Sequence, residues 1–249
     1  MATAKDRMLY RLVITLAAFS FFASAITAQE RSNVSQRTKD ALLHVLAHEM
    51  GHAMLREFDL PVLGPEEDIA DDFATIYIHL TLPDRAADII AARAAQNMAD
   101  GTQPEMFSEY RNDDQRAGRS VCLLYGQDPD GYADLAAQFD LEGDDANNCR
   151  DFSTEVGRSW RRIIANYRMP QDIPVTEVGL VVADNPTAQA LASEDFLEDA
   201  YALMSGIDWH SRITVAFDQC DGGASWSRNG RRITICDAYI ARFESQLAE

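Results

Sequence analysis

The sequence predicts one mainly helical α+β domain with a small antiparallel sheet. Between residues 38 and 167, apolar side chains recur at helical spacing, and short segments rich in proline, glycine and aspartate interrupt them. After Pro170 the pattern changes to short apolar runs with β-branched residues, which favour strands. About 220 residues remain after a processed leader, enough to bury one core.

The N-terminus has the features of a signal peptide. Basic residues precede the apolar stretch 12–22, and small residues follow it. The stretch is shorter than the roughly 20 residues of a membrane span. We therefore expect a signal peptide over residues 1–28, cleaved after Ala25 or Ala28, and no stable membrane insertion afterwards. An uncleaved membrane anchor is the alternative. In both cases the domain, residues 29–249, would be periplasmic or secreted.

Periodicity and helix-breaking residues place the elements in order. The first helix is expected over residues 38–58, because a break with two prolines and a glycine follows it. The second is expected over 66–79, since its acidic start suits a helix N-terminus. Asp84 can cap a third helix that ends near residue 99. The remaining expectations are helices at 113–124, 149–167 and 193–204, turns at 126–148, a strand at 175–182 and paired strands at 212–217 and 231–236.

Four cysteines, an even number, are typical of disulfides in an oxidising compartment. Three pairings are possible. We favour Cys122–Cys149 and Cys220–Cys236, because each pair brackets a single turn-rich segment. A four-cysteine zinc site is the alternative, but no two of these cysteines have the short spacing that such sites use.

The formal net charge is −18, and removal of the basic leader would make it about −20. Nucleic acids and anionic membrane surfaces are therefore poor partners. Solubility is a sufficient explanation for the charge, which gives only a weak indication of basic substrates.

The pentapeptide 48–52, His-Glu-Met-Gly-His, predicts a metal site on the first helix. Residues four apart share a helix face, so His48 and His52 can bind one ion together. Glu49 lies beside them and can take a proton from a water that the metal activates. A surface helix can also carry two such histidines without a metal, so the surrounding sequence has to decide.

The acidic second helix can supply a third ligand, which a catalytic zinc site normally needs. Glu67 and Asp71 are four residues apart and share a face. Glu67 would bind the ion, and Asp71 would accept the free N–H of a ligating histidine. Glu66 and Asp68 remain alternative ligands, because helix phase cannot be fixed within one residue. Glu66 and Asp72 are otherwise expected to face water.

These segments resemble known zinc metallopeptidases. His-Glu-x-x-His followed by Glu-x-x-x-Asp on the next helix resembles the gluzincin class, of which thermolysin is a member. More narrowly, residues 48–53, 60–64, 66–74, 114–126 and 220–236 resemble a bacterial metallopeptidase family. The resemblance implies a zincin-like active-site helix and one zinc ion bound by His48, His52 and Glu67. It also implies Glu49 as the catalytic base.

Two positions depart from that family's pattern. Asp237-Ala238 follow the last cysteine where Tyr-Glu is common, and Tyr110 stands where histidine is common. Related peptidases also use a histidine or tyrosine from a distant segment to stabilise the oxyanion. The candidates for this role are Tyr110, Tyr125, His210 and Tyr239.

The other histidines have simpler explanations. His44 lies one turn before His48 and is expected to be packed or to contact a ligand, since a fourth ligand would leave no place for water. His79 and His210 have no partner at a useful spacing, so they are expected to be structural or exposed.

The sequence therefore predicts a periplasmic or secreted zinc metallopeptidase that cleaves peptide or protein substrates. One alternative is a catalytically inactive zinc-binding or scaffold protein stabilised by two disulfides. Glu49 argues against it, because a structural zinc site needs no base. The other alternative is a metal-independent interaction domain. Substrate specificity and oligomeric state do not follow from the sequence.

Overall fold

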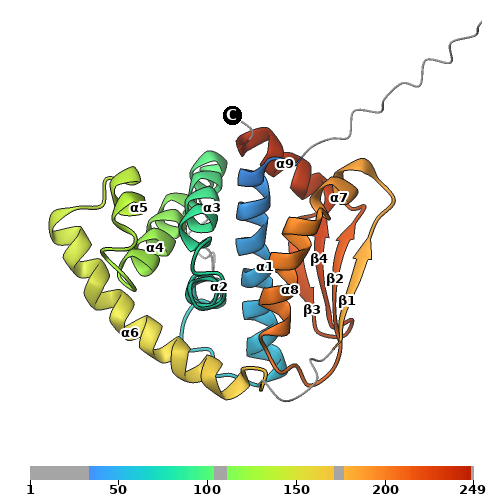
Figure 1. Cartoon of the computed structure of the whole chain (residues 1–249), viewed down its shortest axis with the longest axis horizontal. Helices are drawn as coiled ribbons and strands as arrows, with labels where there is room; N and C mark the ends of the chain where they lie inside the picture. The colour runs from blue at the N-terminus through green and yellow to red at the C-terminus, as the bar shows by residue number, and fades with distance from the viewer. Residues whose placement is uncertain (1–33, 104–110, 171–176, 248–249) are drawn as a thin grey trace, which may run out of the picture. The chain divides into compact units, whose positions relative to one another are not determined.

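The computed structural model describes residues 34–103, 111–170 and 177–247, which form nine helices and one four-stranded sheet (Figure 1). The predicted mainly helical α+β class is confirmed. Two predicted features, the signal peptide at 1–28 and the oxyanion candidate Tyr110, lie outside the described residues.

In the described part of the chain, six helices precede the first strand and three follow it. The first six are α1 (Gln36–Glu57), α2 (Glu66–Thr81), α3 (Ala86–Asp100), α4 (Asp113–Tyr125), α5 (Ala133–Gln138) and α6 (Gly143–Tyr167). The last three are α7 (Pro186–Leu191), α8 (Glu194–Ser205) and α9 (Asp237–Leu247). Within the described residues, no helix combines the length and the apolar character that crossing a membrane requires.

Most helix predictions are confirmed to within a few residues, and α5, α7 and α9 were missed. Asp84 does not cap α3, because the helix begins at Ala86 and its N-cap residue is Arg85. Helix α6 begins at Gly143, within the segment predicted as turns. Gly143 has a positive φ of 60°, a conformation that suits glycine, and the acidic residues after it suit a helix N-terminus.

The sheet is mixed, not antiparallel as predicted. Its order is β1 (Val178–Val182), β2 (Ile213–Asp218), β4 (Arg232–Cys236) and β3 (Ala224–Ser227). The predicted pair β2 and β4 does form, but it is parallel, as is β1 with β2. Only β3 and β4 are antiparallel, because a short hairpin connects them.

Helix α1 lies at the centre of the described fold. It packs against α2 and α3 and also contacts β3, β4, α8 and α9 (Figure 1). The Ser35 side chain accepts a hydrogen bond from the Thr38 N–H and caps the helix. Because neighbours cover α1 on most sides, even its polar residues are buried. Most buried polar groups of this kind have a hydrogen-bond partner.

Two disulfides reinforce the fold. Cys122 and Cys149 join α4 to α6, with a Cα–Cα distance of 5.0 Å. Cys220 and Cys236 close the segment that contains β3, with a Cα–Cα distance of 4.9 Å. Both pairs are those favoured from the sequence. Two disulfides indicate an oxidising compartment.

Candidate metal centre

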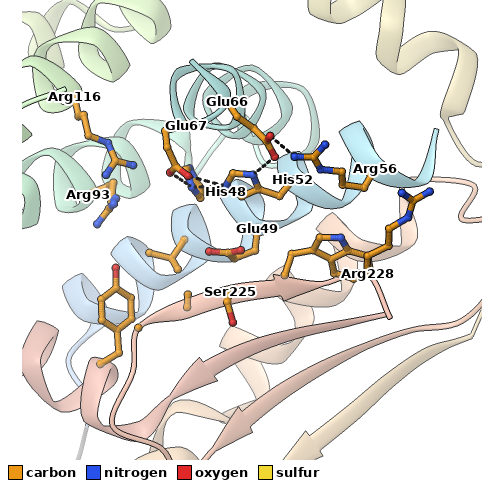
Figure 2. A pocket seen from close by; sticks show the side chains of 15 residues that line it. His48, Glu49, His52, Arg56, Glu66, Glu67, Arg93, Arg116, Ser225 and Arg228 are labelled. Carbon is orange, nitrogen blue, oxygen red and sulfur yellow. Dashed lines mark hydrogen bonds and ion pairs between the residues drawn. The ribbon is translucent and has the colours of Figure 1, made fainter. Parts of the chain in front are cut away.

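A pocket of about 650 Å³ lies between α1 and the edge strand β3 (Figure 2). Helices α2, α3, α4 and α9 contribute further walls. His48, Glu49 and His52 all face it from α1, as their positions on one helix face predicted. The first residues of α2 face them across the pocket (Figure 2).

Three of these side chains form a cluster that can hold a metal ion. The Nε2 atoms of His48 and His52 are 3.1 Å apart. Glu67 places one carboxylate oxygen 3.2 Å from His48 Nε2 and the other 3.5 Å from His52 Nε2. The candidate ligand atoms, one from each residue, lie within 4.8 Å of one another.

A second pair of carboxylates holds the far side of each imidazole. Asp71 Oδ1 is 2.7 Å from His48 Nδ1, the contact that the spacing predicted. Glu66 Oε1 is 3.0 Å from His52 Nδ1. Because a carboxylate only accepts hydrogen bonds, both Nδ1 atoms are the protonated donors. The Nε2 lone pairs are therefore directed toward each other and toward Glu67.

This arrangement of acceptors fits a cation. Two Nε2 lone pairs and a carboxylate repel one another unless a proton or a metal ion lies among them. Burial lowers the pKa of His48, but its interactions with Asp71 and Glu67 outweigh burial and raise the pKa to about 9. For Glu67, burial raises the pKa, but hydrogen bonds from both histidines lower it below its usual range. Without metal, the raised pKa thus favours a proton on His48 beside Glu67.

Gly51 allows α2 to approach α1 closely enough to form this cluster. A Cβ atom at Gly51 would lie only 2.9 Å from the Cα atom of Ala70 on α2. Ala70 lies between Glu67 and Asp71 in sequence, within one helical turn of both. The glycine in the pentapeptide therefore determines how near the carboxylates come to the histidines.

Glu49 lies beside the cluster and is buried, with 6% of its surface exposed. Burial raises its pKa, although the two nearby histidines oppose this. The backbone N–H of Trp226 on β3 donates a hydrogen bond to its carboxylate. Glu49 is thus held between the metal cluster on one side and the sheet edge on the other.

Arginines on and before α4 bind the carboxylates along α2. Arg116 donates to both Asp71 oxygens at 2.8 and 3.0 Å. Arg119 binds both Asp72 oxygens at 2.7 Å. The expectation that Asp72 and Glu66 face water is therefore wrong, because Asp72 is paired and Glu66 contacts both His52 and Arg56.

The other residues considered as metal ligands or as oxyanion donors lie at different places in the fold. Asp68 is paired with Arg111 at 2.7 Å and does not join the cluster. His44 is fully buried, and neither of its ring nitrogens has a hydrogen-bond partner. Its pKa is lowered to about 3 mainly by burial, so it is neutral. Of the oxyanion candidates that the structure describes, Tyr239 alone lines the pocket.

Tyr125 and His210 lie elsewhere in the fold. Tyr125 accepts a hydrogen bond from Arg150, and the His210 ring packs against Phe58. His79 contacts the hydroxyl of Tyr132 at 2.8 Å, as befits the structural role expected of it.

The helical fold and this cluster are consistent with a protein that has a metal site of the His-Glu-x-x-His type. The chain belongs to the DUF4344 family, described as "Putative metallopeptidase", whose model matches residues 7–164. The matched part contains the three clustered residues and Glu49, and it ends near the end of α6. Membership places the chain among hydrolases that act on proteins or peptides. No curated protein and no solved structure matched the chain.

Proposed function

We propose that the chain is a zinc metallopeptidase of gluzincin type that acts in the periplasm or outside the cell after removal of its signal peptide. His48, His52 and Glu67 would hold one zinc ion, and Glu49 would be the general base. The observation that carries this proposal is the convergence of these three side chains within 4.8 Å, with Glu49 beside them in one pocket.

The donor set favours zinc over harder cations. Two imidazole nitrogens and one carboxylate oxygen are typical of catalytic zinc sites, which keep a further position open. When bound, zinc would polarise the scissile carbonyl and lower the pKa of a coordinated water. Asp71 and Glu66 would fix the tautomer of both histidines, which strengthens binding through Nε2.

Glu49 has the properties of a proton acceptor in this reaction. Its raised pKa brings its basicity closer to neutral pH, where general-base catalysis is most effective. A backbone hydrogen bond from Trp226 would help to orient the carboxylate. Glu49 would take a proton from the attacking water and then give it to the leaving amine.

The free edge of β3 would bind the substrate backbone. Cys236 N–H donates to the Gly223 carbonyl at 3.1 Å, which sets the alternation of the antiparallel pair. That alternation directs the N–H and C=O groups of Ala224 and Trp226 away from β4. An extended peptide could pair with the Ala224 N–H and C=O and with the Trp226 C=O, and it would then pass directly by Glu49, which takes the Trp226 N–H.

Tyr239 is our candidate for the residue that stabilises the oxyanion. It lines the same pocket from α9, and a phenolic O–H can donate to a developing negative charge. Tyr110 lies outside the described residues, so this choice concerns Tyr125, His210 and Tyr239 only.

Glu49→Gln tests the proposal. Wild-type protein and the variant should each bind one zinc ion, measured by elemental analysis. Hydrolysis of a mixed peptide pool, followed by mass spectrometry, should fall by about 10²–10⁴-fold in the variant. Glu198→Gln, in the exposed part of α8, is the matched control and should retain activity. If the variant binds zinc and hydrolyses the peptides as fast as the wild-type protein, Glu49 is not the general base. If neither protein binds zinc, the proposed metal centre is refuted.

A further inference from the structure

The pocket is lined by more arginines than acidic residues, unlike the chain as a whole. The chain carries −18 overall, but four arginines and three glutamates line the pocket. Arg93 and Arg116 lie beyond Glu67, and Arg56 and Arg228 lie at the other end (Figure 2). Since Arg116 is paired with Asp71 and Arg56 with Glu66, an anionic group would be attracted mainly by an arginine that has no such partner.

Arg93 differs from the other arginines near the site because its charge is not matched by a carboxylate. It is buried, with 5% of its surface exposed. Among the described residues it makes no ion pair, and its one hydrogen bond runs from Nη1 to the neutral side chain of Gln96. Its Nε atom is buried and has no partner. The guanidinium carbon lies 5.7 Å from the centre of the Phe243 ring.

The neighbouring arginines show what such a side chain normally binds in this fold. Arg111, Arg116 and Arg119 each use Nε to bind a carboxylate of α2, at 2.7, 2.8 and 2.7 Å respectively. The network of Arg93 reaches an acid only indirectly, since Gln96 donates to Asp100. Burying a cation without a counter-charge is unfavourable, so an anion entering the pocket would relieve a cost that folding leaves in place.

We propose that Arg93 binds a carboxylate of the substrate. This inference rests on the proposed function and adds a substrate class to it: peptides with a carboxylate close to the scissile bond. Guanidinium groups bind carboxylates through strong, charge-assisted hydrogen bonds. The carboxylate can come from a free C-terminus or from an aspartate or glutamate side chain. The overall acidity of the chain gave only a weak indication of basic substrates, and Arg93 favours an acidic group in this pocket instead.

The length of the pocket limits where that carboxylate lies. Val45 and Arg56 bound its α1 wall, which corresponds to about 16 Å of helix. This length accommodates about five extended residues. The carboxylate is therefore within about two residues of the bond that is cleaved.

Matched peptide pairs test the inference on the zinc-loaded full chain. The starting point is a neutral peptide that the protein cleaves. It is shortened or extended so that its C-terminus lies at different distances from the cleaved bond, and each length is made with a C-terminal acid and with a C-terminal amide. A second series places Glu or Gln at each position. In one of the two series, kcat/KM should be about 10–100-fold higher for the peptide with the carboxylate, mainly because its KM is lower. The series that shows this difference identifies whether the bound carboxylate is a C-terminus or a side chain.

Arg93→Gln should abolish that preference while cleavage of the neutral peptide stays within a few-fold. Arg242→Gln is the matched control. Its guanidinium carbon lies 5.9 Å from the same Phe243 ring and its Nη2 atom lies 3.5 Å from Asp100, but it does not line the pocket. This control should keep the preference. Arg93→Lys, which retains the charge, should keep part of it and serves as the second variant if Arg93→Gln does not fold.

The inference is overturned if wild-type protein treats both members of every pair alike, or if folded Arg93→Gln keeps the preference. Titration calorimetry of acid–amide and Glu–Gln peptide pairs with Glu49→Gln protein measures the preference without hydrolysis, and these peptides need not be substrates. If wild-type protein cleaves nothing but this binding preference exists and depends on Arg93, the proposed reaction fails and the carboxylate site stands. Equal affinities for acid and amide, and for Glu and Gln, overturn the site.

Discussion

Gly51→Ala tests whether the close approach of α1 and α2 builds the metal centre. A Cβ atom at this position would lie 2.9 Å from Ala70 Cα and 3.2 Å from both its Cβ and its carbonyl oxygen. Two of these three contacts are with backbone atoms, which cannot rotate away. The helices must therefore separate by a few tenths of an ångström, and Glu67 moves with α2.

Two opposing effects determine the expected change in stability. Alanine is favoured over glycine inside a helix by about 0.5–1 kcal/mol. Overpacking against the backbone costs about 1–3 kcal/mol. Gly118→Ala in α4 is the control, because a Cβ there meets nothing within 4 Å and only the favourable effect remains. The difference in unfolding free energy between the two variants should therefore be about 1–3 kcal/mol, with Gly51→Ala the less stable.

The assay is denaturant unfolding of metal-free protein with its disulfides intact, followed by circular dichroism. Metal-free protein is necessary because zinc would add its own binding free energy to the stability. Zinc affinity is then measured by competition with a chelating dye. It should fall about tenfold or more in Gly51→Ala, since Glu67 moves away from both Nε2 atoms. Equal stabilisation of both variants, with wild-type zinc affinity, would refute the reasoning.

Two more predictions concern protons and disulfides. Because the pKa of His48 is raised to about 9, a proton competes with zinc below that pH. The zinc affinity should fall about tenfold per pH unit for each proton displaced as the pH is lowered from 9 to 7. A zinc affinity that does not change with pH in chelator competition would contradict this. Metal-free protein should lose stability as the pH rises from 6.5 through 9, since protonated His48 stabilises the fold, and urea midpoints measure this loss. Replacing Cys220 and Cys236 with serine opens a loop with a sequence separation of 16 and should cost about 3 kcal/mol in urea unfolding. It should also lower kcat/KM but not zinc affinity, because β3 lies in that loop; unchanged kcat/KM would argue against a role for β3.

The sequence was sufficient to predict the features of the fold and the site that depend on the spacing of residues within one helix. The first helix was expected at 38–58 and spans Gln36–Glu57, because its apolar positions recur without interruption. The spacing of four residues likewise placed Glu67 and Asp71 on the face that meets the histidines. Periodicity relates residues of one helix, so it can predict each half of the cluster. It does not give the distance between two helices, which depends on Gly51 and Ala70.

The features that the sequence did not reveal depend on distant contacts. Strand β3 consists of Ala-Ser-Trp-Ser, which has neither β-branched residues nor a long alternating pattern, and it is a strand because β4 pairs with it. The contact of Glu66 with His52 depends on the phase of the first turn of α2. Arg93 lies in an alanine-rich helix, and its burial becomes apparent only when α9 places Phe243 beside it.

The position of Glu49 suggests how metal binding and substrate selection are divided within the chain. Its helix neighbours His48 and His52 lie in the part that matches the family model, where α1 and α2 alone supply the candidate metal ligands. The Trp226 N–H that holds its carboxylate comes from beyond that part. The proposed base therefore receives this hydrogen bond only when the C-terminal sheet packs against α1. Changes in β3 should accordingly alter substrate binding and turnover together while zinc binding persists, whereas changes in α2 should remove the metal first.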